Sequence, residues 1–249
     1  MRSQPSHRST CSTLSKGFSC LLDLLYPPHC VACGKLGAWF CMGCVETTPA
    51  PEPPLCRHCG KPWVRAGLCD DCRQSRSYLA GMRSVALHLP PIRQAVHALK
   101  YEGLKVLAQP LGAMMAEYWQ HAPLPANVII PVPLHRARIR QRGYNQSLLL
   151  ARVLGEQIGL ELRADLLTRE RDTRSQVGLK VAERRDNVSG AFRCRADDLQ
   201  GQRMLLVDDV LTTGATLESC AGALLGAGAA EVWALTLTRA VGADASDRV

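Results

Sequence analysis

Residues 204–216 constrain the fold more than any other part of the chain. They read Met-Leu-Leu-Val-Asp-Asp-Val-Leu-Thr-Thr-Gly-Ala-Thr, and apolar-periodic residues follow at 217–225. This order predicts a buried strand that ends at two carboxylates, a hydroxyl-rich turn, and a helix. The first N–H groups of a helix lack intrahelical partners and its dipole favours negative charge, so the turn is a candidate anion site.

The side chains around this turn favour a phosphorylated sugar. Asp208 and Asp209 can bind sugar hydroxyls or the shell of a Mg²⁺ ion, because hard cations prefer oxygen ligands. Three threonines supply hydroxyl donors, and one glycine lets the backbone approach a phosphate or turn with positive φ. These residues are Thr212, Thr213, Thr216 and Gly214. The alternative is an ordinary strand–turn–helix corner in which the threonines only cap the helix.

The whole string at 204–216 resembles the 5-phosphoribosyl-1-diphosphate (PRPP) binding motif of type I phosphoribosyltransferases. The resemblance implies that the loop binds the ribose 5-phosphate. It also implies that Asp208 and Asp209 face the ribose 2′- and 3′-hydroxyls, where carboxylates can stabilise positive charge at C1 during catalysis. The loop residues concerned are Thr212, Thr213, Gly214, Ala215 and Thr216.

Eight of the twelve cysteines form four Cys-x-x-Cys pairs, which predict two tetrahedral Cys₄ zinc sites. The pairs are Cys30/Cys33, Cys41/Cys44, Cys56/Cys59 and Cys69/Cys72. Cys-x-x-Cys-Gly-Lys occurs at 30–35 and again at 56–61, which indicates a duplicated unit, a double zinc ribbon. Sequential pairing within each unit is therefore favoured over an interleaved cross-brace. Disulfides are disfavoured because no secretion signal is evident, and redox dithiols normally occur singly.

Composition sets broad limits on the class of protein. The chain of 249 residues is 47% apolar, enough for one ordinary domain plus a smaller module. Its net charge of +8 suits a polyanionic ligand, either a diphosphate or a nucleic acid. No run approaches the roughly 20 apolar residues of a membrane helix, and the basic N-terminus lacks a signal peptide's apolar core. We expect no membrane insertion and a cytoplasmic protein.

Alternating strands and helices predict an α/β domain at 78–240, built on a parallel twisted sheet with ligands beyond the strands' carboxyl ends. Besides the segment at 204–216, strands are expected at 78–89, 127–132 and 231–238, and helices at 92–101, 104–119, 144–158 and 217–225. We expect the double zinc ribbon at 18–75, with a stiff proline-rich connection at 45–55. The tails at 1–17 and 241–249 are expected to be disordered.

Two basic segments are candidates for diphosphate binding. Arginines recur at every second position at 136, 138, 140 and 142, in a stretch that we expect to be an extended loop with half of them on each side. One guanidinium group can bind two phosphate oxygens at once. This favours a diphosphate clamp over a solvated loop or a nucleic-acid patch. The second segment, 169–187, has the composition of a movable lid over the site.

These features together resemble the ComF/GntX family, in which a zinc ribbon precedes a phosphoribosyltransferase-like domain linked to natural competence and the use of external DNA. The resemblance covers about residues 20–240. Besides the cysteine pairs and the PRPP motif, it rests on His-Ala-Leu-Lys-Tyr at 97–101, Pro-Val-Pro-Leu-His at 131–135, Arg-Gly-Tyr-Asn-Gln at 142–146, Thr-Arg-Ser-Gln at 173–176 with Leu179, and Arg-Asp-Asn at 185–187.

Two functions remain open from the sequence. The first is a phosphoribosyltransferase that binds Mg²⁺-PRPP and transfers its ribosyl phosphate to an unidentified acceptor. Its diphosphate would lie near Arg140, Arg142 and Lys100, under a lid that includes Arg174, Gln176 and Lys180. The second is a non-catalytic PRPP sensor or adaptor of the DNA-uptake machinery, with single-stranded DNA and DNA-uptake proteins as partners. An aromatic content of only 5% argues against an extended stacking platform for single strands.

Overall fold

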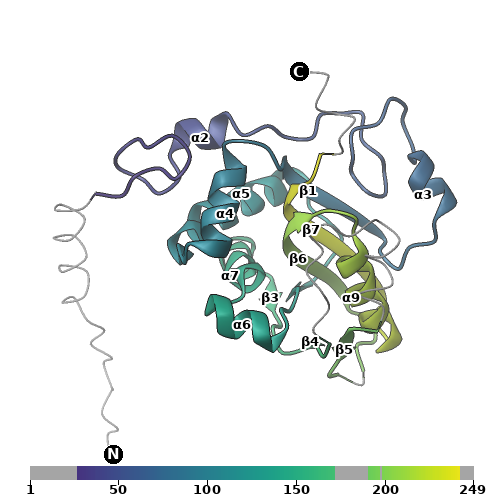
Figure 1. Cartoon of the computed structure of the whole chain (residues 1–249). Coiled ribbons are helices and arrows are strands. Elements are labelled where there is room, and N and C mark those ends of the chain that lie inside the picture. Colours follow the sequence, from purple (N-terminus) through teal and green to yellow (C-terminus); the bar gives the residue numbers. More distant parts are fainter. Residues whose placement is uncertain (1–26, 172–189, 197, 242–249) are drawn as a thin grey trace, which may run out of the picture.

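A five-stranded parallel sheet forms the centre of the protein, with strand order β1-β7-β6-β2-β3 (Figure 1). The computed structural model describes residues 27–171, 190–196 and 198–241. The strands in that order are β1 (Gly81–Leu87), β7 (Glu231–Arg239), β6 (Arg203–Leu211), β2 (Val128–Pro131) and β3 (Glu161–Leu162). The predicted parallel α/β sheet is therefore confirmed.

Helices cover both faces of the sheet (Figure 1). One face packs against α4 (Ile92–Tyr101), α5 (Ala108–His121) and α7 (Gln146–Ile158), and the short 3₁₀ helix η1 (Lys105–Leu107) leads into α5. The other face packs against α9 (Ala215–Gly226) and a small antiparallel pair, β4 (Leu167–Arg169) and β5 (Phe192–Cys194). β6 contributes Leu205 and Val207 to the first core and Met204 and Leu206 to the second. Burial on both faces explains its continuous apolar run.

Most element positions follow the sequence pattern. α4 has the predicted bounds, whereas β1 is shorter than the expected 78–89. Pro110 lies in the first turn of α5, where a helix needs no proline N–H. α7 begins two residues later than expected, because the Asn145 side chain accepts a hydrogen bond from Ser147 N at 3.0 Å and caps the helix.

The extended conformation expected for the arginine segment is wrong: it forms helix α6 (Arg136–Arg142). The side chain of His135 accepts a hydrogen bond from Ala137 N, which satisfies one of the first N–H groups. Gly143 ends the helix in the left-handed region at φ 83°. Helical spacing puts Arg136 and Arg140 on one side of α6 and turns the other two arginines away from them.

The two aspartates lie within β6 and not at its end, so the expectation that the strand ends at the two carboxylates is wrong. β6 continues past them to Leu211, and Asp208 is paired with Thr236 of β7. The apolar residues Val210 and Leu211 extend the ladder with β7, which is why the strand does not stop at the carboxylates. Successive side chains of a strand point to opposite faces, so Asp208 and Asp209 have different surroundings.

The two cysteine-rich units attach to the sheet domain in different ways (Figure 1). The first, which contains α2 (Met42–Glu46), buries Phe40 in the core that it shares with α4 and α5. The second, which contains α3 (Asp70–Gln74), is bound by hydrogen bonds: Arg239 Nη1 donates to Cys59 O at 2.8 Å, and Arg83 Nη1 donates to His58 O at 3.1 Å. The connection expected at 45–55 begins inside α2, and its Pro49 carbonyl accepts from Leu87 N at 2.7 Å.

Several sequence-based expectations concern residues outside those that the structure describes. They are the tails at 1–17 and 242–249 and most of the proposed lid, including Arg174, Gln176 and Lys180. Among the helices of the described ranges, none is long and apolar enough to cross a membrane.

Candidate functional site

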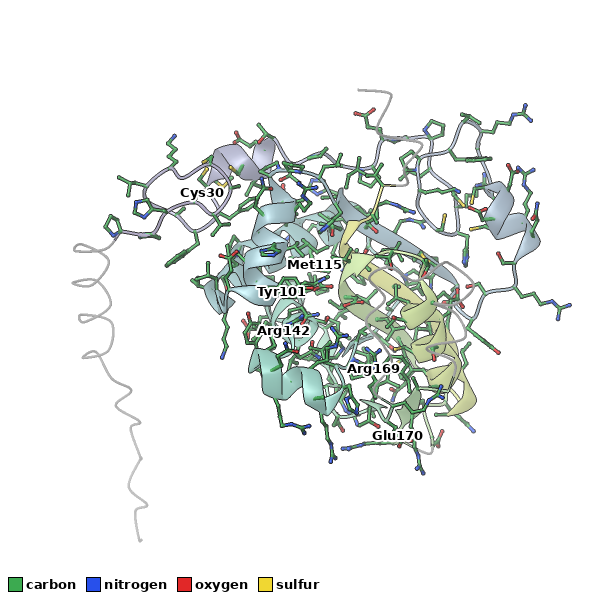
Figure 2. All side chains as sticks on the ribbon, viewed as in Figure 1. Cys30, Tyr101, Met115, Arg142, Arg169 and Glu170 are labelled. Carbon is green, nitrogen blue, oxygen red and sulfur yellow. The ribbon has the colours of Figure 1, made fainter. Side chains whose placement is uncertain are left out.

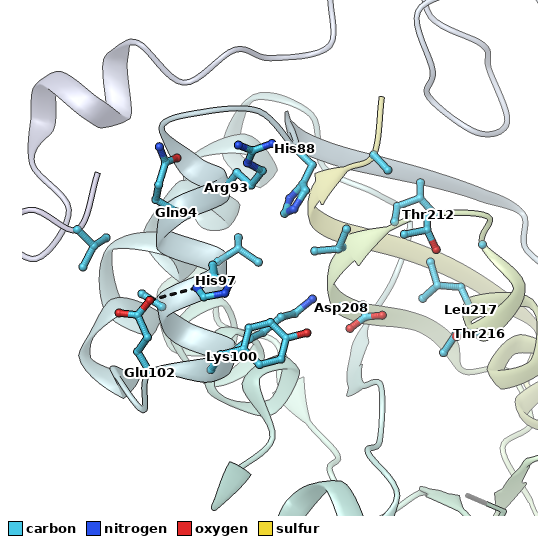
Figure 3. Close-up of a pocket in the computed structure, with 18 residues that line it drawn as sticks. His88, Arg93, Gln94, His97, Lys100, Glu102, Asp208, Thr212, Thr216 and Leu217 are labelled. Carbon is cyan, nitrogen blue, oxygen red and sulfur yellow. Dashed lines mark hydrogen bonds and ion pairs between the residues drawn. The ribbon is translucent and has the colours of Figure 1, made fainter. Parts of the chain in front are cut away.

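A cavity of about 630 Å³ opens between α4, the end of β6 and the start of α9 (Figure 3). It lies beyond the carboxyl ends of β1 and β6, where parallel α/β sheets bind their ligands. The side formed by β6 and the 212–216 loop contributes Asp208, Thr212, Gly214 and Thr216. The opposite side is formed by α4 together with His88, which follows β1, and Val31 of the first cysteine-rich unit.

The loop after β6 is the candidate anion site, and it leads into the N-terminus of α9. Gly214 precedes α9 in the left-handed region at φ 80°, a conformation that favours glycine. Thr213 Oγ1 accepts a hydrogen bond from Ala215 N at 3.4 Å, whereas Thr212 and Thr216 line the cavity. The N-terminus of α9, a helix of 12 residues, thus opens towards the cavity with two threonines beside it.

Asp208 is the carboxylate that lines the cavity. Its Oδ1 accepts hydrogen bonds from Ser147 Oγ at 2.7 Å and from Asp209 N at 2.9 Å. Burial, together with the neighbouring Asp209 carboxylate, raises the pKa of Asp208 to about 7 against the weaker opposing effect of Ser147. Asp208 therefore exchanges its proton near neutral pH and ionises more readily when a cation arrives.

Asp209 lies beneath the cavity and pairs with Lys100. Only 3% of the residue is exposed, it is not part of the cavity wall, and its Oδ2 lies 3.0 Å from Lys100 Nζ. Lys100 itself lines the cavity from α4 and points towards Asp208 in Figure 3. The structure therefore brings together Lys100 and both aspartates, with Lys100 as the counter-ion of a buried carboxylate.

The predicted arginines Arg140 and Arg142 are not part of the cavity wall. Arg142 lies with its guanidinium carbon 5.2 Å from the centre of the Tyr101 ring, and it donates to Gln146 Oε1 (Figure 2). Arg140 is exposed on α6. Three residues were expected near a diphosphate. Lys100 lines the cavity, and Arg142 contacts Tyr101, which also lines it, whereas Arg140 is not among the lining residues.

Sequence reasoning missed His88 and Ser147. His88 Nδ1 lies 2.9 Å from Thr238 Oγ1, and burial, helped by Lys100, lowers the pKa of His88, so that its ring is neutral at pH 7. Figure 3 shows this ring pointing into the cavity. In the sequence, only their positions could have indicated these two residues. His88 directly follows a parallel strand, and Ser147 stands in the first turn of a helix.

The eight predicted cysteines form two sequential quartets, Cys30/Cys33/Cys41/Cys44 and Cys56/Cys59/Cys69/Cys72. Within each quartet the sulfur atoms all lie within 4.8 Å of one another. Cys30 and Cys44 are 3.6 Å apart, as are Cys33 and Cys41, and Cys59 and Cys69 are 3.8 Å apart. Two sulfurs at tetrahedral angles, each about 2.3 Å from one zinc ion, lie roughly 3.8 Å apart, so both quartets fit zinc.

Backbone N–H donors stabilise the thiolate form of at least one cysteine of the second quartet. Burial acts to raise the pKa of Cys56, but donors led by the backbone N–H of Cys69, at 3.3 Å from the sulfur, lower it to about 6. A thiolate is the form that binds zinc. The fold thus stabilises the charged ligand in place.

Comparisons with known proteins agree with both parts of the chain. Residues 21–73 match the family model of the double zinc ribbon domain, and residues 144–247 match that of the phosphoribosyl transferase domain. The DNA utilization protein YhgH of Escherichia coli K12 is 33% identical over 227 residues, which cover 86% of this chain and 99% of that protein.

Two competence proteins are more distant relatives. Competence protein F of Haemophilus influenzae is 29% identical over 206 residues, 78% of this chain and 89% of the relative. Competence protein ComFC of Bacillus subtilis is 25% identical over 210 residues, 80% of this chain and 83% of the relative. The matches therefore extend over most of the length of each protein.

Zinc content of cysteine variants tests the sequential quartets. We expect two zinc ions per wild-type chain and one in either Cys33→Ser/Cys41→Ser or Cys59→Ser/Cys72→Ser, because each pair of changes damages a single quartet. Mass spectrometry of the purified proteins for metals gives the count. An interleaved cross-brace would instead lose both ions in each double variant, which would contradict the grouping.

The elevated pKa of Asp208 predicts a pH-dependent stability. The folded state holds this proton to about pH 7, whereas the unfolded carboxyl releases it near pH 3.9, so the stabilisation present at low pH is lost as pH rises through 7. Between about pH 5.5 and 8.5 the wild type should lose about 2 kcal/mol relative to Asp208→Asn. Urea unfolding without Mg²⁺ measures the difference, and parallel curves for the two proteins would refute the shifted pKa.

Proposed function

The chain belongs to the ComF/GntX family of competence and DNA-utilization proteins, with a double zinc ribbon and a phosphoribosyltransferase domain, and we propose that its cavity binds Mg²⁺-PRPP. The observation that carries the proposal is the joint placement of Asp208, Thr212 and Thr216 on one wall, at the N-terminus of α9. A phosphorylated sugar needs this combination: donors for the phosphate and a carboxylate for hydroxyls or a cation.

The two ends of PRPP would bind to different elements. The 5-phosphate is expected at the loop of Thr212, Thr213, Gly214, Ala215 and Thr216. Asp208 would bind a ribose hydroxyl or the Mg²⁺ shell, and Asp209 would act through Lys100, which it fixes at 3.0 Å. Lys100, and with it Arg142 and Arg140 from the neighbouring α6, would balance the negative charge of the diphosphate.

In the first role that we propose, the protein is a transferase. The bond between C1 and the diphosphate oxygen breaks, and diphosphate leaves with the electron pair. Positive charge develops on the ribose, where the nearby Asp208 carboxylate stabilises it. A nitrogen of the acceptor then bonds to C1 and releases its proton to solvent. Lys100 favours the step because it stabilises the departing anion.

One observation supports a second role, that of a PRPP-responsive adaptor in DNA uptake. Arg136 and Arg140 lie on one exposed side of α6, outside the cavity wall. A basic helix of this kind suits a polyanion such as single-stranded DNA, through contacts with the phosphate backbone. In that case PRPP would be bound without transfer.

Calorimetric titration with Mg²⁺-PRPP tests the binding. Asp208→Asn and Thr212→Val should each weaken binding about tenfold or more, because each removes a polar partner from the cavity wall. Thr168→Val on β4, an equally conservative change outside the cavity wall, is the matched control and should leave the affinity unchanged.

The outcomes separate the two roles. Failure of the wild type to bind PRPP would refute the proposal as a whole. Binding with release of diphosphate in the presence of an acceptor supports the transferase, whereas binding without release from any nitrogen compound supports the adaptor. Binding that is unaffected in Asp208→Asn would remove this carboxylate from the site.

A further inference from the structure

The wall opposite the proposed PRPP loop has a chemistry that PRPP does not require. PRPP consists of a sugar and phosphate groups and has no aromatic part. Nevertheless α4 lines the cavity with two aromatic side chains, His97 and Tyr101, and the first ribbon adds the apolar side chain of Val31. The cavity therefore has two chemically different halves.

The two aromatic side chains of α4 contact each other in a tilted arrangement. The ring centres of His97 and Tyr101 are 5.0 Å apart with an angle of 48° between their planes. Glu102 Oε1 lies 3.1 Å from His97 Nδ1 and holds the imidazole in place. Tyr101 is 63% exposed, and the guanidinium group of Arg142 lies over its ring. An exposed ring that is already paired with a cation can also pack against a planar ring.

The first ribbon completes this half of the cavity. Val31 stands between the first two cysteines of its quartet, and its N–H donates to Trp39 O at 3.0 Å. Cys30 and Cys44, two ligands of the same quartet, are buried in the core shared with α4 and α5. The metal site thus sets the position of Val31 against α4. The second ribbon contributes no residue to the described cavity wall.

Charges on this side favour an anion. Arg93 lines the wall from α4, and Arg142 lies behind Tyr101. Lys100 also lines this wall, but it is already paired with Asp209. Glu102 is occupied by His97, and Asp208 belongs to the opposite wall. A ligand that carries a carboxylate or phosphate would therefore be attracted here, while a cationic ligand would be repelled.

We propose that Val31, His97 and Tyr101 form a second subsite of the cavity, which binds a planar aromatic ring carrying a negatively charged group. The assignment rests on the proposed function only in giving the opposite wall, together with Lys100, to Mg²⁺-PRPP. The subsite lies where an acceptor of the phosphoribosyl group would bind, and Val31 makes the first zinc ribbon a determinant of its specificity.

Ligand-observed NMR on the full zinc-loaded protein, with and without Mg²⁺-PRPP, tests the subsite. The probe is nicotinate, a planar anion. Nicotinamide keeps the ring without the charge, and cyclohexanecarboxylate keeps the charge without a planar ring. We expect nicotinate to bind about tenfold more tightly than either control, because each control removes one of the two attractions.

Two variants of the subsite and one control complete the test. Val31→Asp and Tyr101→Leu should weaken nicotinate binding about tenfold and leave the calorimetric affinity for PRPP within about twofold. Val64→Asp is the matched control, since Val64 is a 77% exposed valine of the second ribbon outside the cavity wall, and it should change neither affinity.

The result can overturn the subsite independently of the proposed function. Equal binding of the three probes, or nicotinate binding that persists in both subsite variants, would refute it even if PRPP binds. A loss of PRPP affinity in the variants as large as the loss of nicotinate affinity would assign this wall to PRPP instead. Nicotinate binding in a protein that fails to bind PRPP would keep the subsite and refute only the proposed function.

Discussion

The position of β6 at the centre of the sheet is the constraint on which the rest of the structure depends. It is hydrogen-bonded to β7 on one side and β2 on the other, and its apolar side chains are buried on both faces. A strand held in this way cannot shift or rotate, so the carboxylates of Asp208 and Asp209 have fixed and opposite directions. The chain leaves β6 and enters α9 through Gly214, which places the N-terminus of that helix beside the cavity that Asp208 also lines.

α4 connects this fixed strand to the first zinc ribbon. Lys100 pairs with the buried Asp209 on one side of the helix, while the core of α4 and α5 includes Phe40 and two cysteines of the first quartet. Without Lys100, the buried Asp209 carboxylate would be an uncompensated charge, which is strongly destabilising. The ion pair therefore holds α4 against the sheet. The ribbon, the helix and the strand therefore surround one cavity. The second ribbon, which is bound to β1 and β7 by arginine–carbonyl hydrogen bonds, can serve in stability or partner binding without touching that cavity wall.

Local sequence patterns predicted the parts of the structure that depend on residues close together in the chain. The spacing of the cysteines was sufficient for both quartets, because two residues between ligands suit one metal, and the apolar period of 92–101 was sufficient for α4. The arginine segment was misjudged because alternation of one residue type says little when a capping histidine and a terminal glycine favour a helix. Val31, His88 and Ser147 could not be found from sequence patterns, since each joins the site through packing between elements far apart in the chain. Asp208 lines the cavity whereas Asp209 is buried beside Lys100. This difference likewise could not be predicted without knowing that β6 continues to Leu211.

A crystal structure of the zinc-loaded protein with Mg²⁺-PRPP would show whether the loop after β6 binds the 5-phosphate. We expect the 5-phosphate at the N-terminus of α9, within hydrogen-bond distance of the backbone and hydroxyl donors at 212–216, with a ribose hydroxyl or Mg²⁺ beside Asp208. A 5-phosphate bound instead by the arginines of α6, with the loop after β6 left without ligand, would contradict this expectation.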